Sequence, residues 1–243
     1  MILYEKTESK AKIEESLLNS HFISKLSVPL SCKKLIAFTL AEVLITLLII
    51  GVVASLVIPA LIANTQDAEL HTAWKKVYAD LDQVAKRIMM DNGGTLIGAF
   101  PDASTMMNSF LLYLNYNKAC YIGQAYGNCW HRNDGSTKYM YGAVVTTWDN
   151  SDAAILNNST LLLFTVNDKN CSTEGWGNMV NCGRIVVDVN GFKKPNIIGK
   201  DINAIWVVKN GIKPLGDKAD KWSLQGCSNS VSGWGCAAQY LYQ

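Results

Sequence analysis

The chain has 243 residues, with 22 Lys and Arg against 20 Asp and Glu, so its formal net charge is +2 at pH 7. The first 37 residues hold six Lys and four acidic residues, so the rest of the chain is electrically balanced. Because the composition has no excess of basic residues, it gives no indication of a nucleic-acid-binding surface, and we predict no nucleic-acid partner. About 180 residues follow the N-terminal 63, which is enough for one packed core.

Residues 1–37 carry mixed charges and only weakly amphipathic pairs of apolar residues. We expect this segment to be a leader peptide that is removed, so it takes no part in the fold.

Residues 38–63 form an apolar segment of 26 residues with a single charge, Glu42. As a helix this segment would be about 39 Å long, whereas the apolar core of a bilayer is about 30 Å thick. We therefore predict a transmembrane helix. A secretory signal peptide is the alternative, but its apolar region would be about 7–15 residues long, and only Ala60–Ala63 suggests a weak cleavage site.

Charges on the two sides of this segment predict its orientation. Lys33 and Lys34 precede the segment, and the first charges after it are Asp67 and Glu69. The positive-inside rule then places the N-terminus in the cytoplasm and the rest of the chain outside.

The segment from Lys33 to Val43 contains two Lys, the small residue Ala37 and then Phe-Thr-Leu-Ala-Glu-Val. It resembles the prepilin cleavage and methylation motif of type IV pilins and of the pseudopilins of type II secretion. Gly51 and Pro59, the fourteenth and twenty-second residues counted from Phe38, also match positions of that family. The family more often has Gly where this chain has Ala37.

The resemblance implies a set of processing and assembly steps. A prepilin peptidase would cut between Ala37 and Phe38 and methylate the new amine. The inner-membrane assembly platform would then move the subunit into a filament made of its own copies or related pilins, with its head in the periplasm or at the cell surface. Glu42 would pair with the amine of Phe38 in a neighbouring subunit, which would offset the desolvation of its carboxylate.

Residues 64–92 continue the helix as an amphipathic half. Its apolar stripe alternates steps of four and three through Leu70, Trp74, Val77, Leu81, Val84 and Ile88. Asp91-Asn92-Gly93-Gly94 provides the expected end. We expect the stripe to pack on a globular head formed by residues 93–243.

The head reads as α+β, with an antiparallel sheet packed on the long helix, and the pilin resemblance implies the same fold. Asp102 is the expected N-cap of one short helix. The expected strands are Ala143–Trp148, Leu161–Val166, Arg184–Val189 and Ala204–Lys209. Asn210-Gly211 predicts a hairpin that returns towards Pro214.

Six cysteines lie after the expected leader, in three neighbouring pairs that are 9, 11 and 9 residues apart: Cys120 and Cys129, Cys171 and Cys182, Cys227 and Cys236. An even number of cysteines outside the cytoplasm indicates disulfides. Six cysteines allow fifteen connectivities, and among these we favour the three local pairs. Zinc is the alternative, but no C-x-x-C occurs and only His131 lies near a cysteine.

Asp188 and Asn190, followed by Gly191 and later by Asp201, suggest a possible calcium loop. The alternative is an ordinary turn after a strand, because an EF-hand would have Glu where this chain has Gly199. No catalytic motif surrounds the three histidines, and we expect no enzymatic activity. Two functions remain: a pilin-like filament subunit, or an uncleaved single-pass membrane protein whose external head binds a ligand or calcium.

Overall fold

The computed structural model describes residues 38–148, 151–175, 177–218, 220–222 and 226–242. The expected leader, with Ala37 at its end, lies outside these residues. The chain divides into two compact units, of which the first ends at Val52 and the second begins at Val53.

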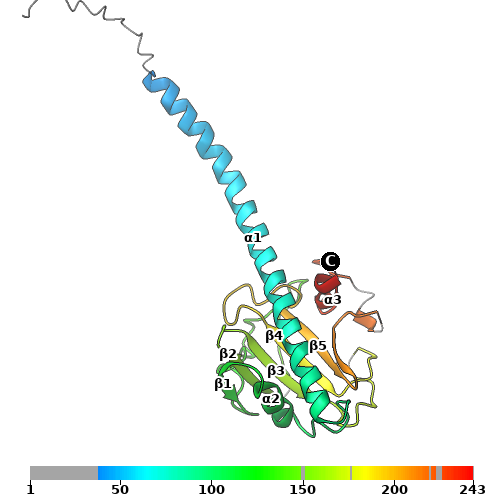
Figure 1. The fold of residues 1–243 in the computed structure, drawn as a ribbon. Helices are drawn as coiled ribbons and strands as arrows, with labels where there is room; N and C mark the ends of the chain where they lie inside the picture. Colours follow the sequence, from blue (N-terminus) through cyan, green and yellow to red (C-terminus); the bar gives the residue numbers. More distant parts are fainter. Residues whose placement is uncertain (1–37, 149–150, 176, 219, 223–225, 243) are drawn as a thin grey trace, which may run out of the picture. The chain divides into compact units, whose positions relative to one another are not determined.

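The described residues form three helices and six strands, most of which are labelled in Figure 1. In chain order they are α1 (Leu40–Asp91), α2 (Ala103–Leu111), β1 (Tyr116–Cys120), β2 (Asp152–Leu156), β3 (Leu161–Val166), β4 (Gly183–Asp188), β5 (Ile202–Val208), β6 (Gly211–Pro214) and α3 (Cys236–Tyr242).

The expected apolar stripe on the second half of α1 is confirmed. Its buried members are Trp74, Val77, Leu81, Val84, Ala85 and Ile88. The helix ends at Asp91, as expected, because Gly93 and Gly94 follow with φ angles of 72° and 90°. That left-handed conformation lets the Gly94 N–H donate to the carbonyl of Met89 at 2.7 Å, which closes the last turn.

The strands form one antiparallel sheet in the order β1-β2-β3-β4-β5-β6, which gives the predicted α+β class. The predicted strand Leu161–Val166 coincides with β3, and the next two predictions overlap β4 and β5 with shifted ends. The hairpin is also confirmed, but its two-residue turn is Lys209-Asn210 and not the predicted Asn210-Gly211, because Gly211 pairs with Val208 and begins β6.

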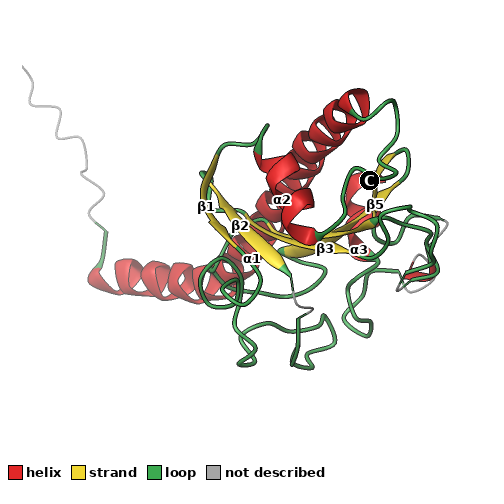
Figure 2. Cartoon of the chain, turned by 90° about the horizontal axis from the view of Figure 1, so that it is seen from below, coloured by secondary structure: helices red, strands yellow, loops and turns green. Residues whose placement is uncertain are grey.

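Strands β3, β4 and β5 are buried on both faces, and their sequences are accordingly nearly continuous apolar runs. On one face lie α2 and the C-terminal part of α1 (Figures 1 and 2), and the ring of Phe110 on α2 contacts Phe164 on β3 with centroids 5.9 Å apart. Long loops cover the other face. The Trp206 Nε1–H on β5, for example, donates to Oδ2 of Asp220 in such a loop at 2.7 Å.

One strand prediction is wrong. Residues 143–148 are not a strand but part of a loop that makes an isolated bridge between Lys138 and Val144. The β-branched and aromatic residues that suggested a strand instead pack on the loop side. Val145 is buried, and the ring of Trp148 meets Trp130 edge-on at 5.2 Å.

Candidate functional site

The start of α1 carries the residues on which the family resemblance depends. The backbone N–H and the hydroxyl of Thr39 donate to Oε2 of Glu42, at 2.9 Å and 3.0 Å. In return, the backbone N–H of Glu42 donates to Oγ1 of Thr39 at 3.2 Å. This reciprocal arrangement is a capping box, in which Thr39 is the N-cap and Glu42 the third helical residue.

The capping box was missed at the sequence level, although Thr-x-x-Glu before an apolar run is its signature. It gives Glu42 a structural role within one chain. Thr39 supplies neutral donors, so the negative charge of the carboxylate is not cancelled. Next to the box, Phe38 is 79% exposed.

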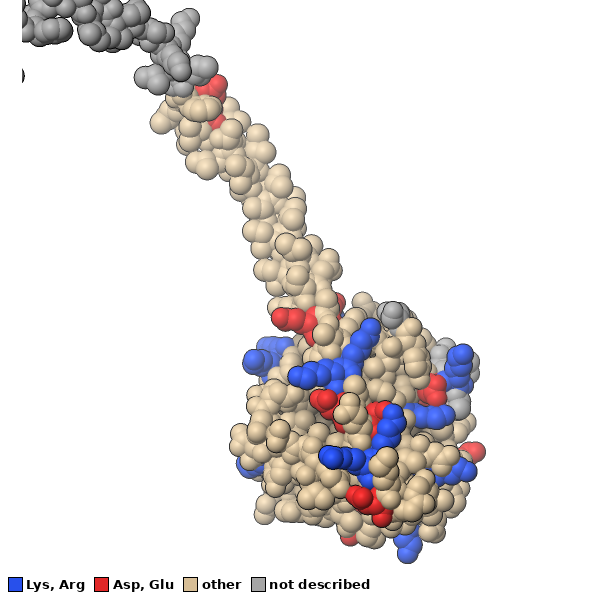
Figure 3. Space-filling view, viewed as in Figure 1, with Lys and Arg blue, Asp and Glu red and all other residues tan. Residues whose placement is uncertain are grey.

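The first part of α1 is long and apolar enough to cross a membrane, with a mean hydropathy of 2.8 over 18 residues, none of them buried within the chain. It is drawn as an almost uncharged stretch in Figure 3. The helix continues without a break through Gly51 and Pro59, both exposed. These features are compatible with a single-pass membrane protein.

The six cysteines lie in the three local pairs that we favoured. The bonds join Cys120 to Cys129, Cys171 to Cys182 and Cys227 to Cys236. Each closes a loop of about ten residues, which constrains the unfolded chain more than the folded one. The bridges therefore stabilise the loops that surround the sheet.

The loop closed by Cys171 and Cys182 has a further organising residue, Asp168. Its carboxylate accepts hydrogen bonds from the backbone N–H groups of Asn170, Ser172 and Thr173 and from the hydroxyls of the last two. These donors favour the ionised form and hold the pKa of Asp168 well below its usual range. Asp168 thus shapes a loop, which is a structural role.

The possible calcium residues lie on the loop side of the sheet. Oδ2 of Asp188 is 2.7 Å from Nε2 of His131, and its Oδ1 accepts the backbone N–H of Asn190 at 3.1 Å. The carboxylate of Asp201 accepts the backbone N–H groups of Asn196 and Ile197, both at 2.7 Å. Three of these four carboxyl oxygens therefore accept backbone N–H groups, and the fourth shares a hydrogen bond with the ring of His131.

This arrangement does not fit calcium, which takes about six to eight oxygen ligands, including ionised carboxylates. Burial raises the pKa of Asp188 to about 7 and also raises the pKa of Asp201. Two amide oxygens, Oδ1 of Asn190 and of Asn196, are buried without a donor and are of a type that calcium accepts, but two such oxygens are fewer than the roughly six to eight that it takes. In the described part of the chain, no group of three or more His, Cys, Asp or Glu side chains is placed to hold a metal ion.

Basic and acidic side chains are mixed on the face of the second unit shown in Figure 3. Comparisons with protein-family models, with curated proteins and with solved structures found no match to this chain.

Proposed function

We propose that this protein is a structural subunit of a type IV pilus or of a type II secretion-type pseudopilus. The observation that carries the proposal is a combination at the start of α1: the motif around Phe38, and the apolar segment 38–63 with Glu42 as its single charge. The α+β head, with an antiparallel sheet and three disulfides, is compatible with a pilin-like fold.

In this proposal the chain is first inserted in the inner membrane with its N-terminus in the cytoplasm. Prepilin peptidase cuts between Ala37 and Phe38 and methylates the new amine of Phe38. The assembly platform then transfers the apolar helix from lipid into a filament core, where it packs against copies of itself or related pilins. The head remains in the periplasm or reaches the cell surface.

Glu42 has two successive roles in this scheme. Within one chain it completes the capping box with Thr39, which supplies hydrogen-bond donors to the carboxylate in an apolar environment. In the filament it pairs with the amine of Phe38 in a neighbouring subunit. That pairing offsets the remaining cost of the buried charge and sets the axial register between subunits.

Two substitutions separate these roles. Gln can replace Glu in a capping box, so Glu42→Gln keeps the cap and removes only the charge, whereas Glu42→Ala removes both. We expect both variants to lose filament assembly, measured by electron microscopy and by immunoblotting of sheared filaments from cells. The membrane level of each variant should stay close to wild type.

Assembly by Glu42→Gln but not by Glu42→Ala would show that the cap matters and the charge does not. Wild-type assembly by both variants would refute the register role. A separate measurement tests processing: the intact mass of membrane-extracted protein should correspond to a chain that begins at methylated Phe38.

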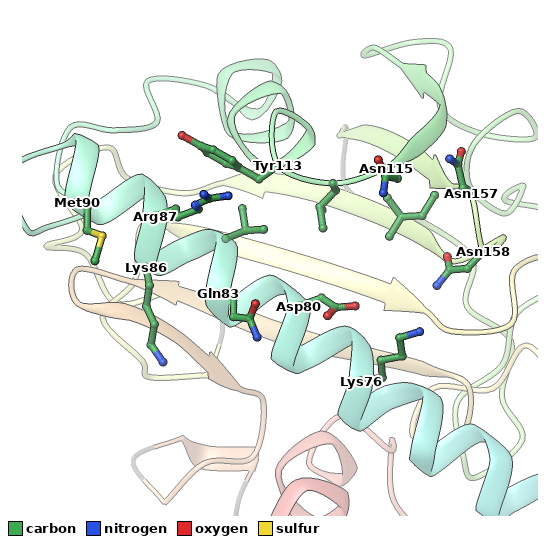
Figure 4. Close-up of a pocket in the computed structure, with 13 residues that line it drawn as sticks. Lys76, Asp80, Gln83, Lys86, Arg87, Met90, Tyr113, Asn115, Asn157 and Asn158 are labelled. Atoms are coloured by element: carbon green, nitrogen blue, oxygen red, sulfur yellow. The ribbon is translucent and has the colours of Figure 1, made fainter.

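The second candidate is an uncleaved single-pass membrane protein with a ligand-binding head. It is favoured by a groove of about 770 Å³ between α1 and residues 113–115 (Figure 4), because such a groove on the head could hold a ligand without filament assembly. An intact mass that includes Met1 would support this candidate and would contradict the first.

A further inference from the structure

The disulfide between Cys227 and Cys236 differs from the other two in its accessibility. Of the six described cysteines, only Cys227 is partly exposed, whereas each of the other five is at most 4% exposed. Its neighbours, Gly226 and residues 228–230, are exposed as well. Solvent therefore reaches this bridge from the side of Cys227, while both ends of the other two bridges are covered.

The other two bridges are shielded by the sheet and by the loops around it. Cys120 on β1 is 3% exposed, and its partner Cys129 is fully buried. Sγ of Cys171 lies 3.8 Å from the carbonyl oxygen of Leu96, and its partner Cys182 is also fully buried. Thiol–disulfide exchange depends on access to a sulfur, so either bridge has to open locally before it reacts.

Access to the third bridge is limited to one of its two sulfurs. Cys236 is the first residue of α3, and its Sγ lies 3.8 Å from Sδ of Met140. A Cβ added at Gly199 would lie 2.9 Å from the same sulfur, so the backbone of that glycine is packed against it. A nucleophile attacks one sulfur of a disulfide and displaces the other. Sγ of Cys227 is therefore the position for attack, and Cys236 is the leaving group.

A tyrosine hydroxyl lies beside the sulfur of Cys227. Oη of Tyr240 is 3.0 Å from that Sγ, and the hydroxyl donates to the carbonyl of Gly199 at 2.8 Å. The ring is fixed by His71, on which it stacks with centroids 3.8 Å apart. Burial raises the pKa of Tyr240 to about 12, so the hydroxyl remains a donor at neutral pH. A donor next to a sulfur stabilises the thiolate that forms there when a disulfide is opened.

We propose that the bridge between Cys227 and Cys236 is a site of thiol–disulfide exchange, which a thiol reductant opens while the other two bridges stay closed. The thiolate of the reductant attacks Sγ of Cys227 and forms a mixed disulfide, and Cys236 leaves as a thiolate that takes up the proton lost by the reductant. A second thiolate attacks the reductant's sulfur in that mixed disulfide. Cys227 then leaves as a thiolate, is stabilised by Tyr240 and takes up the second proton. The reductant has become a disulfide, and the bridge has gained two electrons and two protons.

Opening this bridge loosens the C-terminal part of the head. The loop that it closes, residues 228–235, is joined to the loop before β2 by the Met140 N–H, which donates to the carbonyl of Ser232 at 3.1 Å. The same bridge holds the start of α3, where the carbonyl of Ala237 accepts the indole N–H of Trp74. Reduction therefore acts on α3 and on its contact with α1. This reactivity goes beyond filament assembly and does not depend on it.

The first test uses the full chain with its disulfides intact, in detergent micelles without denaturant. The chain is treated with reduced glutathione and alkylated with iodoacetamide over time, and peptide mass spectrometry locates the alkylated cysteines, separately from Cys32 of the expected leader. Cys227 and Cys236 should become alkylated about tenfold or more faster than the other four, because those must wait for local opening. Glutathione should be found on Cys227 and not on Cys236. Equal rates for the three bridges, or glutathione on Cys236, would overturn the proposal.

Two single variants form a matched pair, because each removes the bridge and leaves one of its thiols. Cys236→Ser leaves Cys227 at the surface, and Cys227→Ser leaves Cys236 inside. The thiol left in Cys236→Ser should react with iodoacetamide about tenfold or more faster than the thiol left in Cys227→Ser, at equal circular dichroism spectra. Equal rates at those spectra would contradict attack at Cys227. The measurement on the wild-type chain does not depend on how the variants fold.

Tyr240→Phe, combined with Cys236→Ser, tests the hydroxyl. Loss of one neutral hydrogen bond lowers the fraction of thiolate, and higher nucleophilicity offsets part of this loss, so the Cys227 thiol should react about two- to fourfold more slowly. If Tyr240 only covered the sulfur, its substitution would make the reaction faster. A faster or unchanged rate would therefore refute the role of the hydroxyl.

Reduced thioredoxin, a protein with a C-x-x-C dithiol, forms the last arm and identifies the source of the thiol. Opening by both reductants assigns the site to any accessible thiol. Opening by thioredoxin, where glutathione leaves all three bridges closed, assigns it to a protein dithiol. If neither reductant opens this bridge before the other two, it is not an exchange site. Because exchange is measured on the unassembled chain, that failure leaves the proposed filament function standing.

Discussion

Trp74 on α1 gives the most direct test of how the last helix is held on the first. Its side chain is fully buried, and its Nε1–H donates to the carbonyl of Ala237 on α3 at 3.0 Å. The adjacent turn of α1 adds a second contact, in which His71 stacks on Tyr240 with ring centroids 3.8 Å apart. We expect substitution of Trp74 to loosen α3 as well as to destabilise the core.

The two parts of this effect can be estimated separately. Trp74→Ala removes the ring and leaves a cavity, which costs about 3–5 kcal/mol. Trp74→Phe keeps most of the apolar contact and loses mainly the hydrogen bond to Ala237, so it should cost about 1–2 kcal/mol, including the smaller ring. Lys75→Ala changes the next residue, which is exposed, and should stay within about 0.5 kcal/mol of wild type.

The assay is urea unfolding of the full chain in detergent micelles, followed by circular dichroism, together with hydrogen exchange of residues 236–242. Both Trp74 variants should exchange faster than wild type in this helix, and Lys75→Ala should not. If Trp74→Ala lowers the free energy of unfolding but leaves exchange in α3 unchanged, the hydrogen bond does not hold this helix and our reasoning is refuted.

Two further predictions concern the loop side of the sheet. Burial raises the pKa of Asp188 to about 7. Between about pH 4 and pH 7 this carboxyl therefore binds more protons in the folded state than in the unfolded state. The contribution of Asp188 to the free energy of unfolding falls as the pH rises through that window. Asp188→Asn has no such proton, so the stability of wild type relative to this variant should decrease from pH 5 to pH 8 in urea titrations; a constant or rising difference would contradict the raised pKa. Replacing both Cys227 and Cys236 by Ser opens a loop of about ten residues and should cost about 2–3 kcal/mol under oxidising conditions. An unchanged unfolding midpoint in the double variant would mean that this bridge does not constrain the unfolded chain.

The parts of the fold that were predicted correctly have strong local signals. The stripe through Trp74 and Leu81 follows the period of a helix, and Leu161–Val166 is a run of residues suited to a strand buried on both faces. Asp102 was predicted as the N-cap of a short helix, and in the structure its Oδ1 accepts the Thr105 N–H at 2.7 Å at the start of α2. In each case one short stretch of sequence determines the local structure.

The missed elements lack such signals. β1 has the sequence Tyr-Asn-Lys-Ala-Cys and forms because β2 offers it an edge, although its own β propensity is low. The acid that begins β2, Asp152, is acceptable there because Ser104 and the Ile122 N–H donate to it. Both depend on contacts between distant residues, which no local pattern records.

The candidate site shows the same division. The resemblance of the segment around Phe38 and Glu42 to a prepilin motif is visible in the sequence, and the capping box could also have been found from Thr39 and Glu42. The hydrogen bond between His131 and Asp188, which are 57 residues apart, could not be predicted, because it depends on how a loop folds over β4. The groove along α1 also brings together residues from three separate parts of the chain.

The order of the elements has a consequence for how the head forms. Each strand pairs with the one before it, and each disulfide joins cysteines at most 11 residues apart, so these contacts can begin as soon as a short segment has been synthesised. The bond between Trp74 and Ala237 spans 163 residues and must wait for the end of the chain. We therefore expect α3 to dock last, and pulsed hydrogen exchange during refolding should show its amides protected after those of β3 and β4. Until that moment the indole of Trp74 is without its final partner, and the nascent head is open along that side of its longest helix.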